Sequence, residues 1–246
     1  MKNSERWLPT KFEFRNGKLR HSRKTQYVKI ESRLVVDSVA KLYEKYLPVY
    51  AKDNLLDLGC GNVPLYGLYS SISPDPTCVD WGSSQHENIH LDVEADLSKP
   101  LEFNDNTFNT VILSDVLEHI PEPEKLIKEV YRILKKDGRL IMNVPFYYWL
   151  HEQPHDFYRY TNFALERFSI NAGFTIELLE TTGGAPEILA DIIAKNIASI
   201  PFLGGLLARF IQSTVGFIVN TKWGRRISKK TSKNFPLGYF MVTQKN

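Results

Sequence analysis

The stretch LLDLGCGNVPLYG, residues 55–67, decides the fold of this chain. Its first four residues are apolar except for Asp57, a pattern typical of a strand buried inside a sheet. Gly59 and Gly61 follow where the chain must turn sharply and where a ligand can approach the backbone closely. Pro64 suits the first turn of a helix, whose free N–H groups favour the anionic end of a ligand. The stretch therefore predicts a strand, a glycine turn and a helix, with a ligand site at the turn.

An acidic residue closes the next apolar run, CVDW at residues 78–81. Asp80 comes 21 positions after Gly59, where a carboxylate can accept hydrogen bonds from ribose hydroxyls. This spacing alone would suit a nicotinamide dinucleotide equally well. A dinucleotide fingerprint requires glycine at the sixth position counted from Gly59, and Pro64 stands there. The turn therefore argues against a site that cradles phosphates.

Short apolar runs alternate with helical stretches along residues 31–180. The predicted helices cover residues 31–50, 65–71, 122–134 and 162–172, and the predicted strands cover residues 54–58, 77–81, 110–114, 139–144 and 175–180. Pro48 follows at the end of the first helix. Such alternation builds βαβ units with right-handed crossovers and a parallel sheet covered on both faces. We therefore predict an α/β fold with an open, doubly wound sheet that binds ligands beyond the carboxyl ends of its strands.

The net charge of the 246 residues is only +3, but it is unevenly distributed. Residues 1–33 carry ten basic and three acidic side chains, and residues 221–246 carry seven basic and no acidic ones. The intervening residues 34–220 have a charge of −11. Two basic ends predict attraction to an anionic membrane surface, a lipid-linked phosphate or a nucleic acid, and solvated tails are the alternative.

The chain contains two cysteines, Cys60 and Cys78, which make no disulfide framework. A chain of this length buries enough surface to fold without disulfides or a structural metal. We therefore expect both cysteines to be packed thiols in a reducing compartment. The first residues show no apolar core followed by a small-residue cleavage site. We expect a cytoplasmic protein, peripheral at the inner membrane face if its basic ends bind lipid.

Several motifs in order resemble those of the class I S-adenosylmethionine-dependent methyltransferases, of the type 11-like kind, from about Asn54 to Glu180. LLDLGCG resembles their nucleotide-binding turn, CVDW the acidic end of their second strand, and EADL (94–97) their adenine contact. SDVLEHI (114–120) and the following residues 122–145 are similar to their fourth strand, helix and fifth strand. The resemblance implies a seven-stranded, mostly parallel sheet, S-adenosylmethionine as cofactor, and residues after Pro236 as a final antiparallel strand. One departure is Val63, where many members have glycine.

The resemblance also implies roles for residues at these strand ends. It places Asp57 near the amino group of the cofactor, its methionine portion at the turn, and the sulfonium near the end of the fourth strand. It places the ribose at the end of the second strand and the adenine at EADL. The implied cofactor-binding residues are Asp57, Gly59, Cys60, Gly61, Asp80, Trp81, Asp96, Leu97, Ser114 and Asp115. For each acidic residue, a helix cap or a solvated loop charge is the alternative.

Ionisable and aromatic residues concentrate in PFYYWLHEQPHDFYRYT, residues 145–161. A loop at this edge of the sheet would form the wall for the methyl acceptor, and a hydroxyl acceptor needs a general base. The candidate catalytic residues are His151, His155, Asp156 and Tyr158. His151 and His155 are four residues apart but have no third ligand in a fixed pattern, so no metal site is predicted. The alternative is a packed loop in which Asp156 pairs with Arg159.

This loop resembles the corresponding region of methyltransferases associated with bacterial surface-polysaccharide biosynthesis. The resemblance implies a small-molecule or lipid-linked acceptor, such as a sugar hydroxyl, and O-methylation. A nucleic-acid methyltransferase is favoured by the basic ends, but the motif of asparagine or aspartate, two prolines and an aromatic residue is absent after the fourth strand, where SDVL stands. A non-catalytic protein that binds S-adenosylmethionine is the third alternative.

Residues 181–234 form an addition that a minimal fold of this kind does not require. Between Asn196 and Thr221 the only charged residue is Arg209, yet no run is long enough for a spanning helix. The segment predicts apolar helices that pack as a lid or lie on an anionic membrane. We divide the chain into a basic extension (1–30), a methyltransferase core (31–180), this helical insertion (181–234) and the last strand of the core (235–246).

Overall fold

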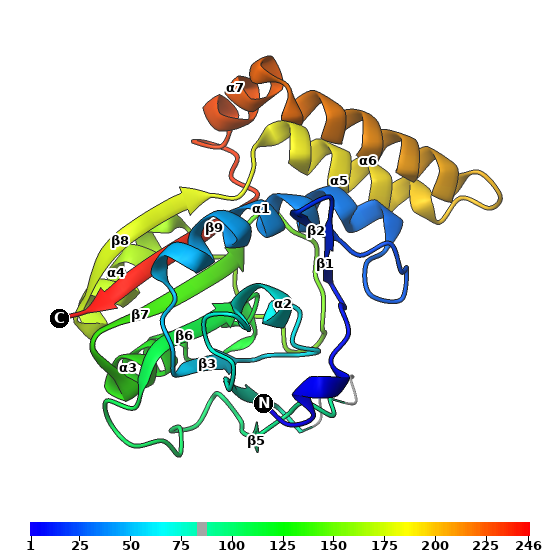
Figure 1. Ribbon diagram of the computed structural model, residues 1–246. Helices are drawn as coiled ribbons and strands as arrows, with labels where there is room; N and C mark the ends of the chain where they lie inside the picture. The colour runs from blue at the N-terminus through cyan, green and yellow to red at the C-terminus, as the bar shows by residue number, and fades with distance from the viewer. Residues whose placement is uncertain (83–87) are drawn as a thin grey trace.

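The computed structural model describes residues 1–82 and 88–246 and shows a central sheet between helices, with a helical arm on one side (Figure 1). Seven strands form the sheet in the order β5-β4-β3-β6-β7-β9-β8. These strands are β3 (Leu55–Leu58), β4 (Thr77–Asp80), β5 (Val93–Glu94), β6 (Phe108–Ser114), β7 (Leu134–Pro145), β8 (Phe174–Thr181) and β9 (Gly238–Lys245). Only β9 runs antiparallel to its neighbours, and it lies between β7 and β8. The predicted doubly wound, mostly parallel α/β sheet with a final antiparallel strand is confirmed.

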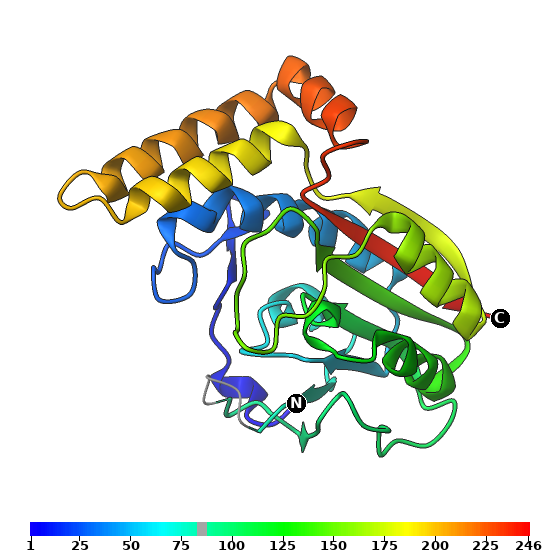
Figure 2. The ribbon, with the colours of Figure 1, turned by 180° about the vertical axis from the view of Figure 1, so that it is seen from behind.

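Two pairs of helices cover the two faces of the sheet, as the two opposite views show (Figures 1 and 2). On one face, α1 (Arg33–Tyr50) and α2 (Tyr66–Tyr69) pack on strand side chains such as Leu55. On the other face, α3 (Pro123–Ile133) and α4 (Asn162–Ala172) pack on side chains such as Leu56. All four residues of β3 are buried, because helices cover both of its faces.

Helix α1 ends at Tyr50 as predicted, whereas strand β7 differs clearly from its predicted bounds. Pro48 lies in the last turn of α1, which ends where Ala51 donates to the carbonyl of Leu47. Proline in the last turn removes a single backbone donor, which a helix end tolerates better than its middle. Strand β7 begins at Leu134, five residues before the predicted start, because the segment before Arg139 also pairs with β6 across an irregular register.

The basic N-terminal residues pack against the rest of the molecule. After a short 3-10 helix, η1 (Ser4–Arg6), strands β1 (Phe12–Arg15) and β2 (Lys18–His21) form an antiparallel hairpin. Its turn is Asn16-Gly17, with positive φ at both residues, as a tight hairpin requires. The backbone N–H of His21 donates to Asp37 on α1, so the hairpin packs against the core. A second 3-10 helix, η2 (Ile30–Ser32), leads into α1.

Three helices form the arm: α5 (Ala185–Ala198), α6 (Gly204–Asn220) and α7 (Lys222–Thr231). The arm lies over α1 and projects beyond the sheet (Figure 1). Gln212 of α6 fixes it there, because its buried side chain accepts from the backbone N–H of Leu34 and lies within hydrogen-bonding distance of the carbonyl of Ala190. Within the described residues, no helix has both the length and the apolar character needed to cross a membrane.

Candidate active site

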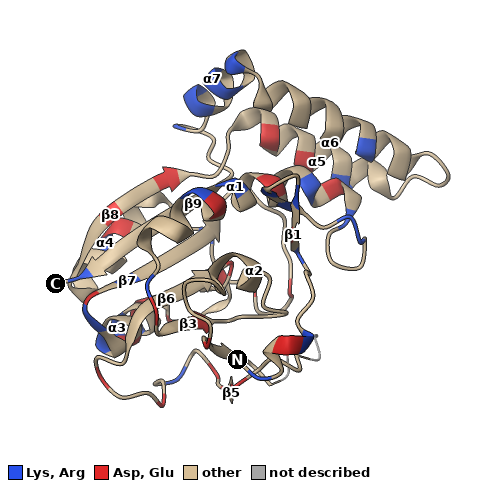
Figure 3. Cartoon of the chain, in the orientation of Figure 1, with Lys and Arg blue, Asp and Glu red and all other residues tan. Residues whose placement is uncertain are grey.

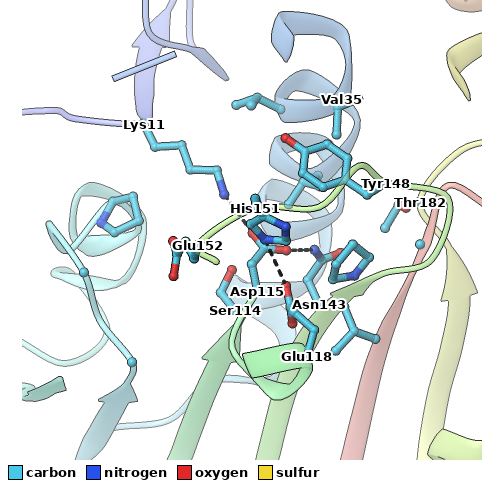
Figure 4. A pocket seen from close by; sticks show the side chains of 18 of the residues that line it. Lys11, Val35, Ser114, Asp115, Glu118, Asn143, Tyr148, His151, Glu152 and Thr182 are labelled. Carbon is cyan, nitrogen blue, oxygen red and sulfur yellow. Dashed lines mark hydrogen bonds and ion pairs between the residues drawn. The ribbon is translucent and has the colours of Figure 1, made fainter. Parts of the chain in front are cut away.

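A cavity of about 300 Å³ opens at the carboxyl ends of β3, β6 and β7 (Figure 4). Its floor is the glycine turn after β3 and the segment after β6, and its walls come from α1, the N-terminal segment and the loop after β7. Of the residues with predicted roles, those that line it are Gly59, Cys60, Gly61, Ser114, Asp115 and His151. The structure does not bring Asp57, Asp80, Trp81, Asp96, Leu97, His155, Asp156 or Tyr158 to its surface.

The glycine turn has the left-handed backbone that its sequence predicts. Gly59 has φ +76°, and a Cβ there would lie 2.4 Å from a methyl group of Val116. Gly61 has φ +49°, and a Cβ there would meet nothing within 4 Å. Val63 also has φ +47°, a conformation that a β-branched residue rarely adopts. Val63 therefore has a backbone conformation that glycine, but not valine, adopts without strain.

Asp80 lies beside this turn. Its Oδ2 accepts a hydrogen bond from the N–H of Gly61 at 2.6 Å, and its Oδ1 accepts one from the N–H of Trp81 at 2.7 Å. The carboxylate at the end of β4 is therefore fixed against the turn that follows β3. The open space above Gly61 and the carboxylate beside it suit a ligand that brings a nucleoside and a polar tail to this edge. The residues present thus fit the S-adenosylmethionine implied by the resemblance.

Asp57 is in the core between β3 and α2, not in the cavity. Its side chain is buried and accepts a hydrogen bond from the hydroxyl of Tyr69 at 2.8 Å. Burial raises the pKa of Asp57 to about 7, with a smaller contribution from the negative charge of Asp80. The Asp57 carboxylate therefore lies behind the glycine turn, inside the core, and does not line the cavity.

Asp96 and Leu97 follow β5, the strand at one edge of the sheet. Asp96 accepts from the backbone N–H and the hydroxyl of Ser98, at 3.0 and 2.6 Å, and pairs with Lys99. The hydrogen bonds from Ser98 lower the pKa of Asp96. Leu97 is buried in the core beneath α3. The Asp96 carboxylate thus accepts hydrogen bonds from its own turn, as the capping alternative to an adenine contact predicts.

Asp115 carries an interaction that the sequence did not indicate. Lys11 reaches across the cavity from the N-terminal segment, and its Nζ lies 2.7 Å from Oδ2 of Asp115 (Figure 4). The side-chain amide of Asn143 donates to the other oxygen of Asp115 at 2.5 Å. Burial acts to lower the pKa of Lys11, but the charge and the hydrogen bond of Asp115, with smaller contributions from its other neighbours, together outweigh it and the pKa is raised. The basic extension therefore contributes a side chain to the site instead of a free tail.

Glu118 is a further residue of the cavity that the sequence reasoning missed. It lies in η3 (Leu117–His119), just after β6, and is completely buried while lining the cavity. Neither carboxylate oxygen has a hydrogen-bond partner among the described residues. Burial and then the charge of Asp115 raise the pKa of Glu118 well above its ordinary value. The available signal was the adjacent Glu-His pair in SDVLEHI, which directly follows a strand end.

Two histidines face this carboxyl group. Nε2 of His119 and Nε2 of His151 each lie 3.7 Å from Oε1 of Glu118, and the two rings meet edge to face at 4.7 Å. His155 lies apart from these two histidines, because its ring packs on Trp81. Glu118 and His119, from the residues after β6, together with His151 form a group that could hold a metal ion, although the sequence predicted no metal site.

The other loop candidates have structural partners. Arg159 holds Asp156 with two hydrogen bonds of 2.6 and 2.8 Å and lowers its pKa to about 2. This is the packed-loop pair that the sequence left as the alternative. The hydroxyl of Tyr158 donates to the carbonyl of Pro121 at 2.9 Å. Among the four candidates, His151 is the one that lines the cavity.

Comparisons with known proteins agree with this geometry. Residues 56–142 match the family model described as "Methyltransferase domain". Over 114 residues the chain is 28% identical to demethylmenaquinone methyltransferase from Lactobacillus johnsonii, an alignment covering 41% of this chain and 47% of that protein. The matched segments span less than half the length of the curated relatives.

Solved structures share the fold at low sequence identity. A S-adenosylmethionine-dependent methyltransferase from Archaeoglobus fulgidus has a TM-score of 0.55 at 17% identity, covering 89% of this chain and 99% of that one. The (4+2)-cyclase SpnF has a TM-score of 0.56 at 18% identity, covering 87% and 82%. Residues 56–142 thus match a methyltransferase domain, the chain shares the fold of S-adenosylmethionine-dependent methyltransferases of known structure, and both comparisons support S-adenosylmethionine as the cofactor.

Proposed function

We propose that this protein transfers a methyl group from S-adenosylmethionine to a hydroxyl of a small-molecule or lipid-linked acceptor. The observation that carries the proposal is the single cavity that joins the glycine turn to Glu118 and His151. A cofactor held at the turn would present its methyl group toward the wall formed by residues 145–161. Ionisable side chains on that wall can then handle the acceptor, while the other wall binds the donor.

The cofactor side of the cavity is assigned by contacts with the turn. The Gly59–Gly61 backbone would hold the methionine portion, Asp80 the ribose hydroxyls, and Ser114 the region near the sulfonium. Asp57 would act from behind the turn, supporting it through the strand. Trp81, Asp96 and Leu97 would form the outer, adenine end, beyond the cavity.

The transfer itself is a displacement at carbon. When bound, S-adenosylmethionine supplies a methyl group that is already activated by its positive sulfur. The oxygen of the acceptor hydroxyl forms the new bond to that carbon, the carbon–sulfur electron pair returns to sulfur, and the hydroxyl proton must leave. Positioning accounts for most of the acceleration in such a step. We assign activation of the acceptor hydroxyl to His151 together with Glu118.

The arm supports a lipid-linked acceptor. Large apolar side chains are exposed along α6, and Arg209 is the charged residue within that helix. These side chains are Leu206, Leu207, Phe210, Phe217 and Ile218, and Leu203 is exposed just before the helix begins. Helix α7 adds a cluster of basic side chains directly beside it (Figure 3). An apolar face next to a basic one matches the interface of an anionic membrane, from which a lipid-linked sugar would reach the cavity.

Vesicle binding tests the lipid contact. We expect sedimentation with phosphatidylglycerol vesicles but not with phosphatidylcholine vesicles at low salt. Replacing Lys229 and Lys230 of α7 by glutamate should abolish it, whereas the same change at Lys135 and Lys136, on β7, should not. Recovery of the protein in the supernatant under all conditions would contradict this part of the proposal, and dimers in analytical ultracentrifugation would indicate that a second copy covers the apolar face.

Two measurements test the activity. Calorimetry should detect binding of S-adenosylhomocysteine, and incubation with a labelled methyl donor should label the lipid or small-molecule fraction of a cell extract. Binding without any labelled fraction would favour a non-catalytic protein. Label in nucleic acid would overturn the proposed acceptor class, and absence of cofactor binding by folded protein would overturn the function altogether.

A further inference from the structure

We propose that Glu118, His119 and His151 form a binding site for a divalent first-row transition metal ion such as Zn²⁺ or Mn²⁺. Their ligand atoms lie within 4.8 Å of one another at the inner wall of the cavity. Two imidazoles and one carboxylate are a common ligand set for such ions when one coordination position is left open. The orientation of each group supports the assignment.

The ring of His119 is oriented by the loop after β7. Its Nδ1 lies 2.8 Å from the carbonyl oxygen of His155. A carbonyl oxygen can only accept, so Nδ1 must carry the proton and donate it. In the neutral ring, the lone pair is then on Nε2, which faces Glu118 at 3.7 Å.

The ring of His151 is oriented in the same way by a different set of acceptors. Its Nδ1 lies 3.3 Å from the carbonyl oxygen of Trp149 and 3.3 Å from Oδ2 of Asp156. Both partners are acceptors, so the proton is again on Nδ1 and the lone pair of Nε2 faces Glu118. Arg159 fixes Asp156 in turn. A carboxylate behind a histidine is the usual outer partner of a metal-bound imidazole.

When Glu118 is ionised, as an ion bound to it would require, three electron-pair donors converge here. The buried oxygens of Glu118 have no hydrogen-bond partner in residues 1–82 and 88–246, a costly arrangement unless a cation joins them. Ligands on one zinc ion are about 2.0–2.2 Å from it, so they lie about 3.0–3.5 Å apart. The observed 3.7 Å separations are closer to that spacing than to a direct hydrogen bond of about 2.7–3.0 Å.

The site leaves room for a further ligand on the side of the cavity. Glu118 and His151 both line the cavity, and the nearby cations Lys11 and Arg159 are already paired with Asp115 and Asp156. The role of the ion rests on the proposed function: its open position would hold the acceptor oxygen. The ion would make a hydroxyl bound there acidic enough to lose its proton to water, and His151 and Glu118 would then activate the hydroxyl as ligands of the ion.

Metal binding to the full chain tests the site directly. Protein dialysed against a chelator and then against ZnCl₂ or MnCl₂ should retain one ion per chain by mass spectrometry, and added metal should raise its melting temperature. We expect Glu118→Gln and His119→Gln each to weaken the affinity at least tenfold. The matched controls are His155→Gln, whose carbonyl and not its ring contacts His119, and Glu122→Gln on the exposed surface.

The outcomes separate the two proposals. If wild-type protein retains no ion, or if Glu118→Gln and His119→Gln bind it as well as wild type does, the metal site is wrong and Glu118 is a neutral acid. If either variant fails to fold, cobalt absorption of the wild-type protein still reports whether nitrogen ligands bind the ion. Binding of S-adenosylhomocysteine by metal-free protein is measured separately, so its loss would affect the proposed function and leave the site standing.

Discussion

Nζ of Lys11 lies 2.7 Å from Oδ2 of Asp115, and this ion pair joins two positions 104 residues apart. Nearby, the indole N–H of Trp7 donates to the carbonyl of Val63 at 3.0 Å, and the hydroxyl of Thr10 donates to the carbonyl of Asn62 at 3.2 Å. The N-terminal segment therefore crosses the glycine turn and reaches the end of β6. The N-terminal segment completes the wall of the cavity, so we expect that loosening this segment would also loosen the site.

We expect Lys11→Met to lower the free energy of unfolding by about 1–2 kcal/mol, because it leaves the half-buried Asp115 beside Glu118 without its partner. Lys11→Arg keeps the charge and should lose less than half as much. Urea unfolding of the three proteins measures both values. Equal stability of Lys11→Met and the wild type would show that the ion pair is not part of what orders this wall.

Substitutions in the glycine turn should separate steric conflict from backbone strain. Gly59→Ala combines a positive φ with a contact to Val116, so we expect a loss of about 2–4 kcal/mol in stability. Gly61→Ala meets open space and should lose only about 1 kcal/mol. Thermal unfolding provides the comparison. Adding Val116→Ala to Gly59→Ala should recover part of its loss; if it does not, the contact with Val116 is not the cause.

The core of the fold could be predicted because its signals are local in the sequence. The alternation of apolar runs and helical stretches marks the strands, and the glycine turn of residues 59–61 marks where the sheet binds ligands. The hairpin at Asn16-Gly17 had a sequence signal as strong as that of the glycine turn, because an Asn-Gly pair flanked by strand-forming residues favours a tight turn. It was not predicted because the charge of the surrounding residues suggested a tail.

The site was only partly predictable, because its chemistry depends on contacts between distant segments. Glu118 is separated from His151 by 33 positions, and nothing in either local sequence shows that Nε2 of the histidine faces the carboxyl group. The same holds for Lys11 and Asp115. By contrast, Asp80 and Gly61 follow neighbouring strands, so the parallel topology brings them together.

Removal of the Asp80 carboxylate should weaken cofactor binding. Asp80→Ala loses the acceptor that would bind the ribose and also frees the N–H of Gly61, so we expect the affinity for S-adenosylhomocysteine to fall at least tenfold. Calorimetry on the purified protein measures it. The control is Asp105→Ala, an exposed aspartate that pairs with Arg132, for which no change is expected. An unchanged affinity for Asp80→Ala would remove this residue from the cofactor site.

The buried Asp57 should make stability depend on pH. Its pKa is about 7 in the folded protein against an ordinary 3.8, so unfolding releases its proton and stability falls as the pH rises from about 4 to 7. At 1.36 kcal/mol per pH unit, the loss approaches about 4 kcal/mol and is constant above pH 7. Asp57→Asn cannot ionise. Its stability relative to the wild type should rise through this range, as urea unfolding at pH 4.5, 6 and 8 would show; a constant difference would contradict the raised pKa.

Asp156 should act as a positioning residue for His151. Its buried carboxylate accepts from both terminal nitrogens of the Arg159 guanidinium and from the backbone N–H of His151, so Asp156→Asn breaks the two-pronged pair and should reduce stability by about 2–3 kcal/mol. Because these contacts lie in the loop after β7 and not at the glycine turn, S-adenosylhomocysteine affinity should be unchanged while the rate of methyl transfer at saturating acceptor falls at least tenfold. Hydrogen exchange should increase within residues 145–161. Unchanged transfer in a variant with this increased exchange would mean that the orientation of His151 does not matter for the reaction.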